Sequence, residues 1–148
     1  MIRIFSAESN PSLAPARNLV NCQRVIRTDD LANITQHSYH QTLFEMLGVF
    51  SIGGNFKLET IPYFWEFFTS PKWLGLEPER LFITDIPKNA SDLDNKRFLE
   101  ICNIVFPEFY HQGEINLPLK EKCVDVGGGL ERIAMVVQSK KNTFEIDL

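Results

Sequence analysis

The feature that most constrains this chain is a stretch near its C-terminus, where an apolar run leads through three glycines into a helical pattern. This stretch, Val124–Ile133, reads Val-Asp-Val-Gly-Gly-Gly-Leu-Glu-Arg-Ile. Because glycine has no Cβ, consecutive glycines let the backbone approach a ligand closely. A helix that begins directly behind them leaves N–H groups unpaired and directed at the gap. With Asp125 on one side and Arg132 in the helix, these groups suit a small zwitterion or a phosphorylated nucleotide.

The bulk composition narrows the function classes. A chain of 148 residues is expected to form one domain, 1–148, that buries a core. The net charge is −4 and no basic stripe is visible, so the chain is not expected to grip nucleic acid by itself. Three cysteines without CxxC spacing predict free buried thiols in a reducing compartment and no metal site. No apolar run has membrane-spanning length, so we expect a cytoplasmic protein without a membrane partner.

The hydrophobic pattern predicts an α+β fold with an antiparallel sheet and few helices. Strands are expected at 19–26 and 42–52, joined by a long loop and paired antiparallel, with further strands at 81–86, 97–110 and 122–126. Residues 1–17 read as a loose leader and 87–96 as a short linker.

Two helices are expected. The first covers 57–69, where Leu58, Ile61, Trp65 and Phe68 stand at helical spacing, and Pro62 should shorten or kink it. The second begins at Leu130, and its apolar face also includes Ile133, Ala134 and Val137.

Three segments, in order along the chain, resemble the alanyl form of the class II aminoacyl-tRNA synthetases. Val124–Ile133 is similar to the third class II motif, which in that family usually reads Asp-Thr-Gly-Met-Gly-Leu-Glu-Arg. Thr42–Gly53 is similar to the second motif, and Arg97–Phe106 to the strand that bears the family's alanine-binding Asn. The resemblance implies an antiparallel β-sheet flanked by helices, here in incomplete form, and the use of ATP with Mg2+ to activate alanine for transfer to tRNA.

The resemblance assigns one group of residues to the nucleotide. Arg27 and Arg132 are the candidate catalytic residues: Arg27 would hold the α-phosphate, and Arg132 would lie over the adenine or reach a phosphate. Gly127 and Gly129 would let the backbone approach ATP, and Glu45 would border it. Each arginine has a plain structural alternative, because Arg27 could be a surface residue before a turn and Arg132 a surface partner of a carboxylate.

A second group is implied for the amino acid. Asp125 would meet the alanine ammonium and Asn103 would fix the substrate beside it, with Val105 and Gly127 completing the alanine site. Asp125 could instead be a turn residue before glycines. Asn103 could be a strand amide paired to backbone.

The orientation of the second predicted strand stays open, because side chains alternate between the two faces of a strand. Glu45 faces the site with Leu43 and Leu47, or Phe44 and Met46 face it instead.

The chain also departs from the family pattern. Tyr39 stands where the family loop carries an arginine, and the family's longer, Trp-bearing segment is missing between Asp85 and Arg97. We expect the leader to be too short for the first class II motif. Two functions therefore remain open: an alanine–tRNA ligase-like catalytic core, or an inactive binding module or subunit that retains part of the ATP and alanine pocket. In either case tRNA is expected to bind weakly unless further domains or other synthetase parts associate.

Overall fold

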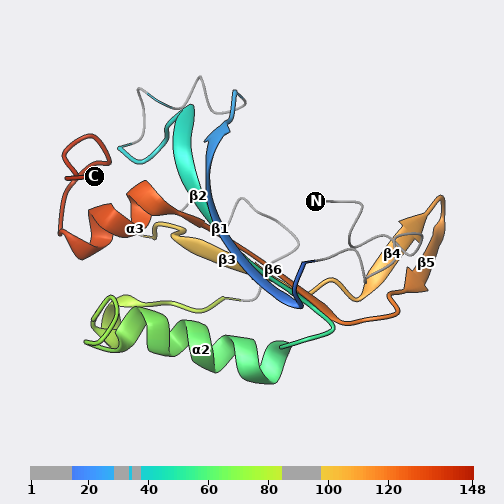
Figure 1. Cartoon of the computed structure of the whole chain (residues 1–148). Helices are drawn as coiled ribbons and strands as arrows, with labels where there is room; N and C mark the ends of the chain where they lie inside the picture. Colours follow the sequence, from blue (N-terminus) through green and yellow to red (C-terminus); the bar gives the residue numbers. More distant parts are fainter. Residues whose placement is uncertain (1–14, 29–33, 35–37, 85–97) are drawn as a thin grey trace.

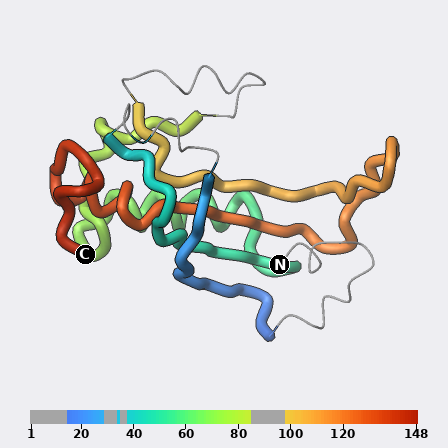
Figure 2. Tube along the Cα trace, turned by 90° about the horizontal axis from the view of Figure 1, so that it is seen from above, coloured from blue at the N-terminus to red at the C-terminus, as the bar shows by residue number. Residues whose placement is uncertain are grey.

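The chain folds around a four-stranded antiparallel sheet. The computed structural model describes residues 15–28, 34, 38–84 and 98–148. The strands lie in the order β1-β2-β6-β3, so the last strand in the sequence is inserted between two earlier ones (Figures 1 and 2). Their bounds are β1 Asn18–Ile26, β2 Leu43–Ile52, β3 Cys102–Val105 and β6 Cys123–Gly129.

The first two strands confirm the predicted antiparallel pair. They run side by side over their whole length, from the Asn18–Ser51 pair to the Ile26–Leu43 pair. Both segments are rich in residues that fit a pleated, half-buried surface. Strand β6 lies between β2 and β3, and on one of its faces Val124 and Val126 are 1% and 2% exposed. The observed α+β fold with its antiparallel sheet confirms the expected fold class.

Helix α2 (Lys57–Thr69) lies along one face of the sheet and has the predicted bounds (Figure 1). Its start is held by Glu59, whose carboxylate accepts the backbone N–H of Phe56 at 3.1 Å. The expectation that Pro62 shortens or kinks the helix is wrong as to shortening, since the helix continues for about two further turns beyond it.

Most of the residues at helical spacing on α2 are exposed. Leu58 and Ile61 are exposed, as is Trp65, whereas Thr60 is buried and Phe64 is half-buried one turn later. The helical period of this segment therefore does not indicate which of its residues are covered.

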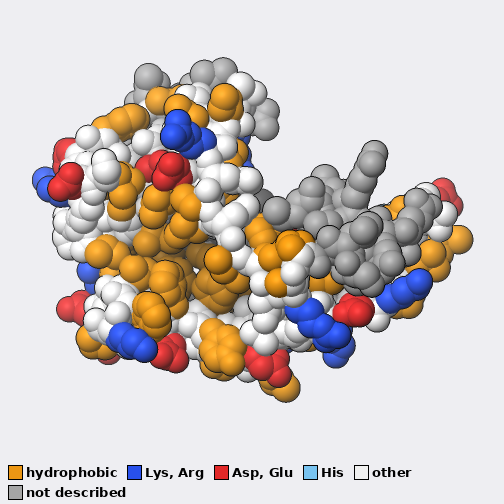
Figure 3. Space-filling view, in the orientation of Figure 1, with side chains coloured by type: hydrophobic (Ala, Val, Ile, Leu, Met, Phe, Trp, Pro, Cys, Tyr) orange, Lys and Arg blue, Asp and Glu red, His pale blue; other side chains and the backbone are white. Residues whose placement is uncertain are grey.

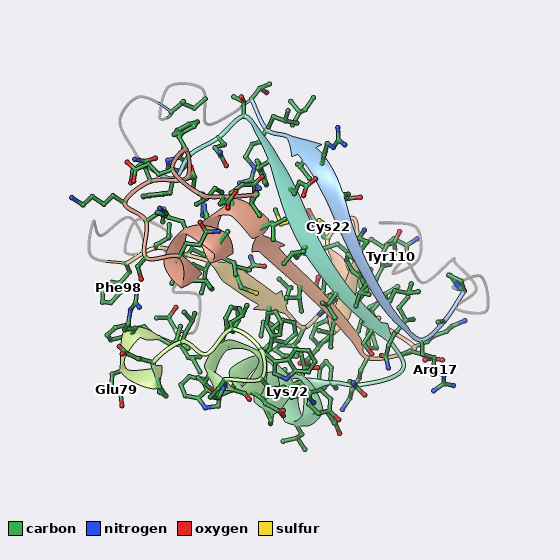
Figure 4. All side chains as sticks on the ribbon, turned by 60° about the vertical axis from the view of Figure 1, so that its left-hand side comes forward. Arg17, Cys22, Lys72, Glu79, Phe98 and Tyr110 are labelled. Atoms are coloured by element: carbon green, nitrogen blue, oxygen red, sulfur yellow. The ribbon has the colours of Figure 1, made fainter. Side chains whose placement is uncertain are left out.

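Helix α3 (Leu130–Val137) follows β6 directly and packs against β2 and β6. It confirms the second predicted helix. Ile133 and Met135 are its buried residues, whereas Val137 at its end is exposed. Apolar side chains gather in the space between the sheet and α2, which the stick view also shows to be filled (Figures 3 and 4).

The prediction of one strand over 97–110 is wrong for its described part. Strand β3 ends at Val105, and a separate strand β4 (Phe109–Gln112) pairs with β5 (Ile115–Pro118), which was not predicted. Pro107 lies in the break and has no N–H to donate to a ladder. The β4–β5 hairpin turns at Gly113, whose φ is 63°, and projects away from the main sheet (Figure 1).

Other expectations fall partly on residues that are not described. Residues 81–84 are irregular and follow the short 3-10 helix η3 (Pro78–Arg80), so the strand expected there is wrong for those positions. The rest of that strand, the linker 87–96 and the leader up to residue 14 lie outside the described residues. The three cysteines are free thiols as predicted, although only Cys123 is buried and Cys22 is exposed.

Candidate active site

A cavity of about 220 Å³ lies where strand β6 passes into helix α3. Its walls come from the end of β1 and the loop after it, from β2, from the residues that lead into β3, and from the first turn of α3. The residues that line it are Arg27, Tyr39, His40, Gln41, Phe44, Met46, Glu100, Ile101, Cys102, Asn103, Gly127, Gly129, Glu131 and Arg132.

Sheet register brings the glycines and Asn103 together. Gly127 pairs with Gly48 of β2 on one side and with Asn103 of β3 on the other, while Gly129 pairs with Met46. Paired residues in adjacent strands present their side chains on the same face. Asn103 and Met46 therefore face the cavity over a floor of glycine backbone.

The glycines of β6 matter for the space that their missing side chains leave, and not for an unusual backbone conformation. None of the three has a positive φ. A Cβ at Gly127 would lie 3.5 Å from Met46 Sδ and 3.9 Å from Asn103 Oδ1, which are ordinary contacts. The expected close approach to a ligand fits this geometry, because a side chain at Gly127 would occupy the cavity and not the protein core.

Both candidate catalytic arginines line the cavity. The Arg27 backbone N–H donates to the Thr42 carbonyl at 2.8 Å, and its guanidinium Cζ lies 5.8 Å from the centre of the Phe44 ring. Arg132 Nη1 donates to the Glu100 carbonyl at 3.0 Å. Two positive side chains from opposite ends of the chain thus meet at one cavity, an arrangement that suits an anionic ligand.

The residues implied for alanine do not all reach the cavity. Asn103 lines it, whereas Asp125 and Val105 pair with each other one step further along the sheet and are not among the lining residues. Asp125 lies on the same face as Gly127, because the two are separated by two positions in one strand. It is half-buried, and this burial raises the pKa of its carboxyl above the usual 3.8. An approaching cation would favour the ionised form.

Glu45 has its side chain away from the cavity. Its Oε1 lies 3.9 Å from Arg24 Nε, and Cys22 Sγ donates to its Oε2 at 3.8 Å. Of the two arrangements that the sequence leaves open, the structure has the second, in which Phe44 and Met46 face the site. Only the Glu45 backbone is connected to the site, since its N–H donates to Glu131 Oε1 at 2.8 Å.

Sequence reasoning missed Glu100 and Glu131 as lining residues. Glu131 Oε2 is buried without a hydrogen-bond partner among the described residues. Buried carboxylate oxygens normally have partners, and Mg2+ takes oxygen ligands from one or two carboxylates together with substrate phosphates. The residues present therefore fit a magnesium ion that arrives with a nucleotide. Glu131 lies inside the Gly-rich motif, so its position beside Arg132 was the available signal.

The fold and the site together are those of a class II aminoacyl-tRNA synthetase catalytic domain: an antiparallel sheet carrying two arginines beside a Gly-rich turn from strand to helix. The profile of the family described as tRNA synthetases class II (A) matches residues 3–93 and 83–148. The chain belongs to this family. The chain spans only 21% of the length of the curated relatives described below.

Those relatives are alanine–tRNA ligases. The proteins of Lactobacillus johnsonii and Latilactobacillus sakei are 34% identical over 190 and 189 residues, and that of Staphylococcus aureus is 33% identical over 187. Each alignment covers 88% of this 148-residue chain, so it must include positions of the relative that this chain lacks. Among solved structures, a pyrrolysyl tRNA synthetase of Desulfitobacterium hafniense covers 93% of this chain and 48% of its own, at 12% identity and a TM-score of 0.40.

Within the described part of the chain, no helix has the length and apolar character needed to cross a membrane. The same residues contain no cluster of three or more His, Cys, Asp or Glu side chains placed to hold a metal ion by themselves.

Proposed function

We propose that this chain is a catalytic core that activates alanine with ATP and supports its transfer to tRNA. The observation that carries the proposal is the meeting of Arg27 and Arg132 with Asn103 over the glycine floor of one cavity. These residues come from three separate segments of the chain, and the resemblance implies each of them for the same reaction. The sequence identity to alanine–tRNA ligases supports the choice of amino acid.

The proposed reaction joins two anions, so it depends on cations and positioned donors more than on acid–base groups. A carboxylate oxygen of alanine attacks the α-phosphorus of ATP, and the bond from that phosphorus to the bridging oxygen of pyrophosphate breaks. Arg27 would offset the charge on the α-phosphate, and Arg132 would contact the nucleotide from the first turn of α3. Glu131 would hold Mg2+, which supplies charge neutralisation at the phosphates when bound.

On the amino-acid side, Asn103 lines the cavity and would orient alanine by hydrogen bonding. Asp125 would attract the ammonium group from the neighbouring position on the same face. Glu45, in contrast, would act only through its backbone bond to Glu131, because its side chain pairs with Arg24 and Cys22.

Alanine-dependent exchange of pyrophosphate into ATP tests this proposal. We expect exchange by the wild-type chain and its loss in Arg27→Ala. Arg24→Ala is the matched control, because Arg24 lies on β1 three positions before Arg27, is exposed, and forms a surface ion pair with Glu45. If well-folded wild-type protein gives no more exchange than Arg27→Ala, the activation proposal is wrong.

The alternative is an inactive binding module, favoured by Tyr39 where the family loop carries an arginine. Calorimetry with ATP, alanine and a non-hydrolysable alanyl-adenylate mimic separates the two. Tight binding of the mimic without exchange supports the module. The transfer step is expected to need further domains, since a net charge of −4 offers few cations to tRNA phosphates.

A further inference from the structure

Tyr39 lines the cavity but has no role in the proposed reaction. The Arg132 guanidinium lies over its ring, with Cζ 5.1 Å from the ring centre. The Tyr39 ring also contacts the His40 ring at an angle of 39°, with the two ring centres 4.6 Å apart. The tyrosine thus connects the loop before β2 to the first turn of α3.

The backbone next to Tyr39 is held by the C-terminal segment. The Ser38 carbonyl accepts two hydrogen bonds from Thr143, one from its backbone N–H at 3.0 Å and one from its hydroxyl at 3.3 Å. Thr143 is only 2% exposed. The segment is itself fixed to the end of α3, because Gln138 and Asp147 exchange two hydrogen bonds of 2.9 Å. These bonds hold the backbone beside Tyr39 to the segment that follows α3.

The Arg132 side chain is therefore restrained by two different contacts. Its guanidinium lies over the Tyr39 ring, with Cζ 5.1 Å from the ring centre, and its Nη1 donates to the Glu100 carbonyl at 3.0 Å. The ring contact and the hydrogen bond together restrict where the guanidinium can lie. A guanidinium has five N–H donors, so others remain to contact an anion. An arginine ordered in advance loses less conformational entropy when a ligand binds.

We propose that Tyr39 is a positioning residue that holds the Arg132 guanidinium ready for the nucleotide. The inference rests on the proposed function, since it assumes that the cavity binds ATP. Tyr39 adds no charge to the site. It acts through Arg132, and its aromatic ring rather than its hydroxyl does so.

The first test compares ATP binding by Tyr39→Leu and Tyr39→Phe in calorimetric titrations. Tyr39 and Arg132 are both half-buried, and loss of their cation–π contact should weaken ATP binding about two- to fivefold in Tyr39→Leu. Tyr39→Phe keeps the ring and should bind as the wild type does. Tyr63→Leu is the matched control, because Tyr63 is exposed on α2 and does not line the cavity. ATP binding by Tyr39→Leu as tight as the wild type, or tighter, would overturn the proposal, and a tighter value would identify the ring as an obstacle.

The second test does not need a nucleotide. The Arg132 Nε–H signal, assigned by its loss in Arg132→Lys, should carry a ring-current shift in the NMR spectrum of the free protein. This shift should persist in Tyr39→Phe and disappear in Tyr39→Leu. If the wild type binds no ATP, the proposed function fails, while the shift still decides whether Tyr39 positions Arg132. An unchanged signal in Tyr39→Leu would contradict the inference whatever the outcome with ATP.

Discussion

Gly127→Ala should separate ligand binding from folding in this chain. The added methyl would lie 3.5 Å from Met46 Sδ and 3.9 Å from Asn103 Oδ1, so it meets its neighbours at ordinary distances. Gly127 does not have a positive φ, so alanine adopts its backbone without strain. Folding should therefore be little affected, with a change in the free energy of unfolding within about 0.5 kcal/mol, as for surface substitutions.

Ligand binding should respond differently, because the methyl projects into the cavity between Met46 and Asn103. The cavity measures about 220 Å³, which leaves little room to shift a substrate sideways. One methylene more or less in a binding pocket changes the preference between two substrates by about 1–3 kcal/mol, or about 10- to 200-fold. We expect Gly127→Ala to lower alanine-dependent pyrophosphate exchange within that range.

Gly48, which pairs with Gly127, should behave in the opposite way, because Gly48→Ala is expected to lower the stability of the fold. A Cβ there would overlap Asn21 Oδ1 and lie 2.8 Å from two carbons of the Phe50 ring, which is 8% exposed. Overpacking of this kind costs about 1–3 kcal/mol. Urea unfolding measures the stability of both variants, and the pyrophosphate exchange assay measures their activity. A large loss of stability in Gly127→Ala, or unchanged exchange in a stable Gly127→Ala, would refute the placement of Gly127 at the substrate.

Two further predictions concern titratable groups. Burial raises the pKa of Asp125 above 3.8, and only the ionised carboxylate attracts an ammonium, so alanine affinity should fall as pH drops through that raised value. Calorimetry across this pH range should show the fall in alanine affinity for the wild type and no such fall for Asp125→Asn. If the affinity of both proteins depends on pH in the same way, Asp125 does not attract the alanine ammonium. Burial, followed by the charge of Glu100, raises the pKa of Cys102 to about 12, so iodoacetamide at pH 8 should modify exposed Cys22 well before Cys102. Peptide mass spectrometry gives the order, and early modification of Cys102 would contradict it.

Local patterns predicted the elements that depend on nearby residues. The β1–β2 pair, the bounds of α2 and the start of α3 follow from β-forming runs and helical periods, which lie within short stretches of the sequence. The Gly-rich motif also located the strand-to-helix turn at which the cavity lies. What such patterns could not predict is which face of an element is covered, because that depends on neighbours brought in by the fold.

Two corrections illustrate this limit. Alternation along β2 allows either Glu45 or Phe44 to face the site, and the pairing of β2 with β6 selects Phe44. The helical period of α2 fits several apolar faces, and its packing buries Thr60 instead of Leu58.

Motifs in the sequence indicated the family, and local patterns predicted the β1–β2 pair, α2 and α3. Five of the eight residues expected at the site line the cavity, whereas the fold places Asp125, Val105 and Glu45 outside its lining and Tyr39 against Arg132. These placements depend on contacts between residues that are far apart in the chain. Thr143 holds Ser38 across 105 positions, and no local propensity contains a contact of that kind.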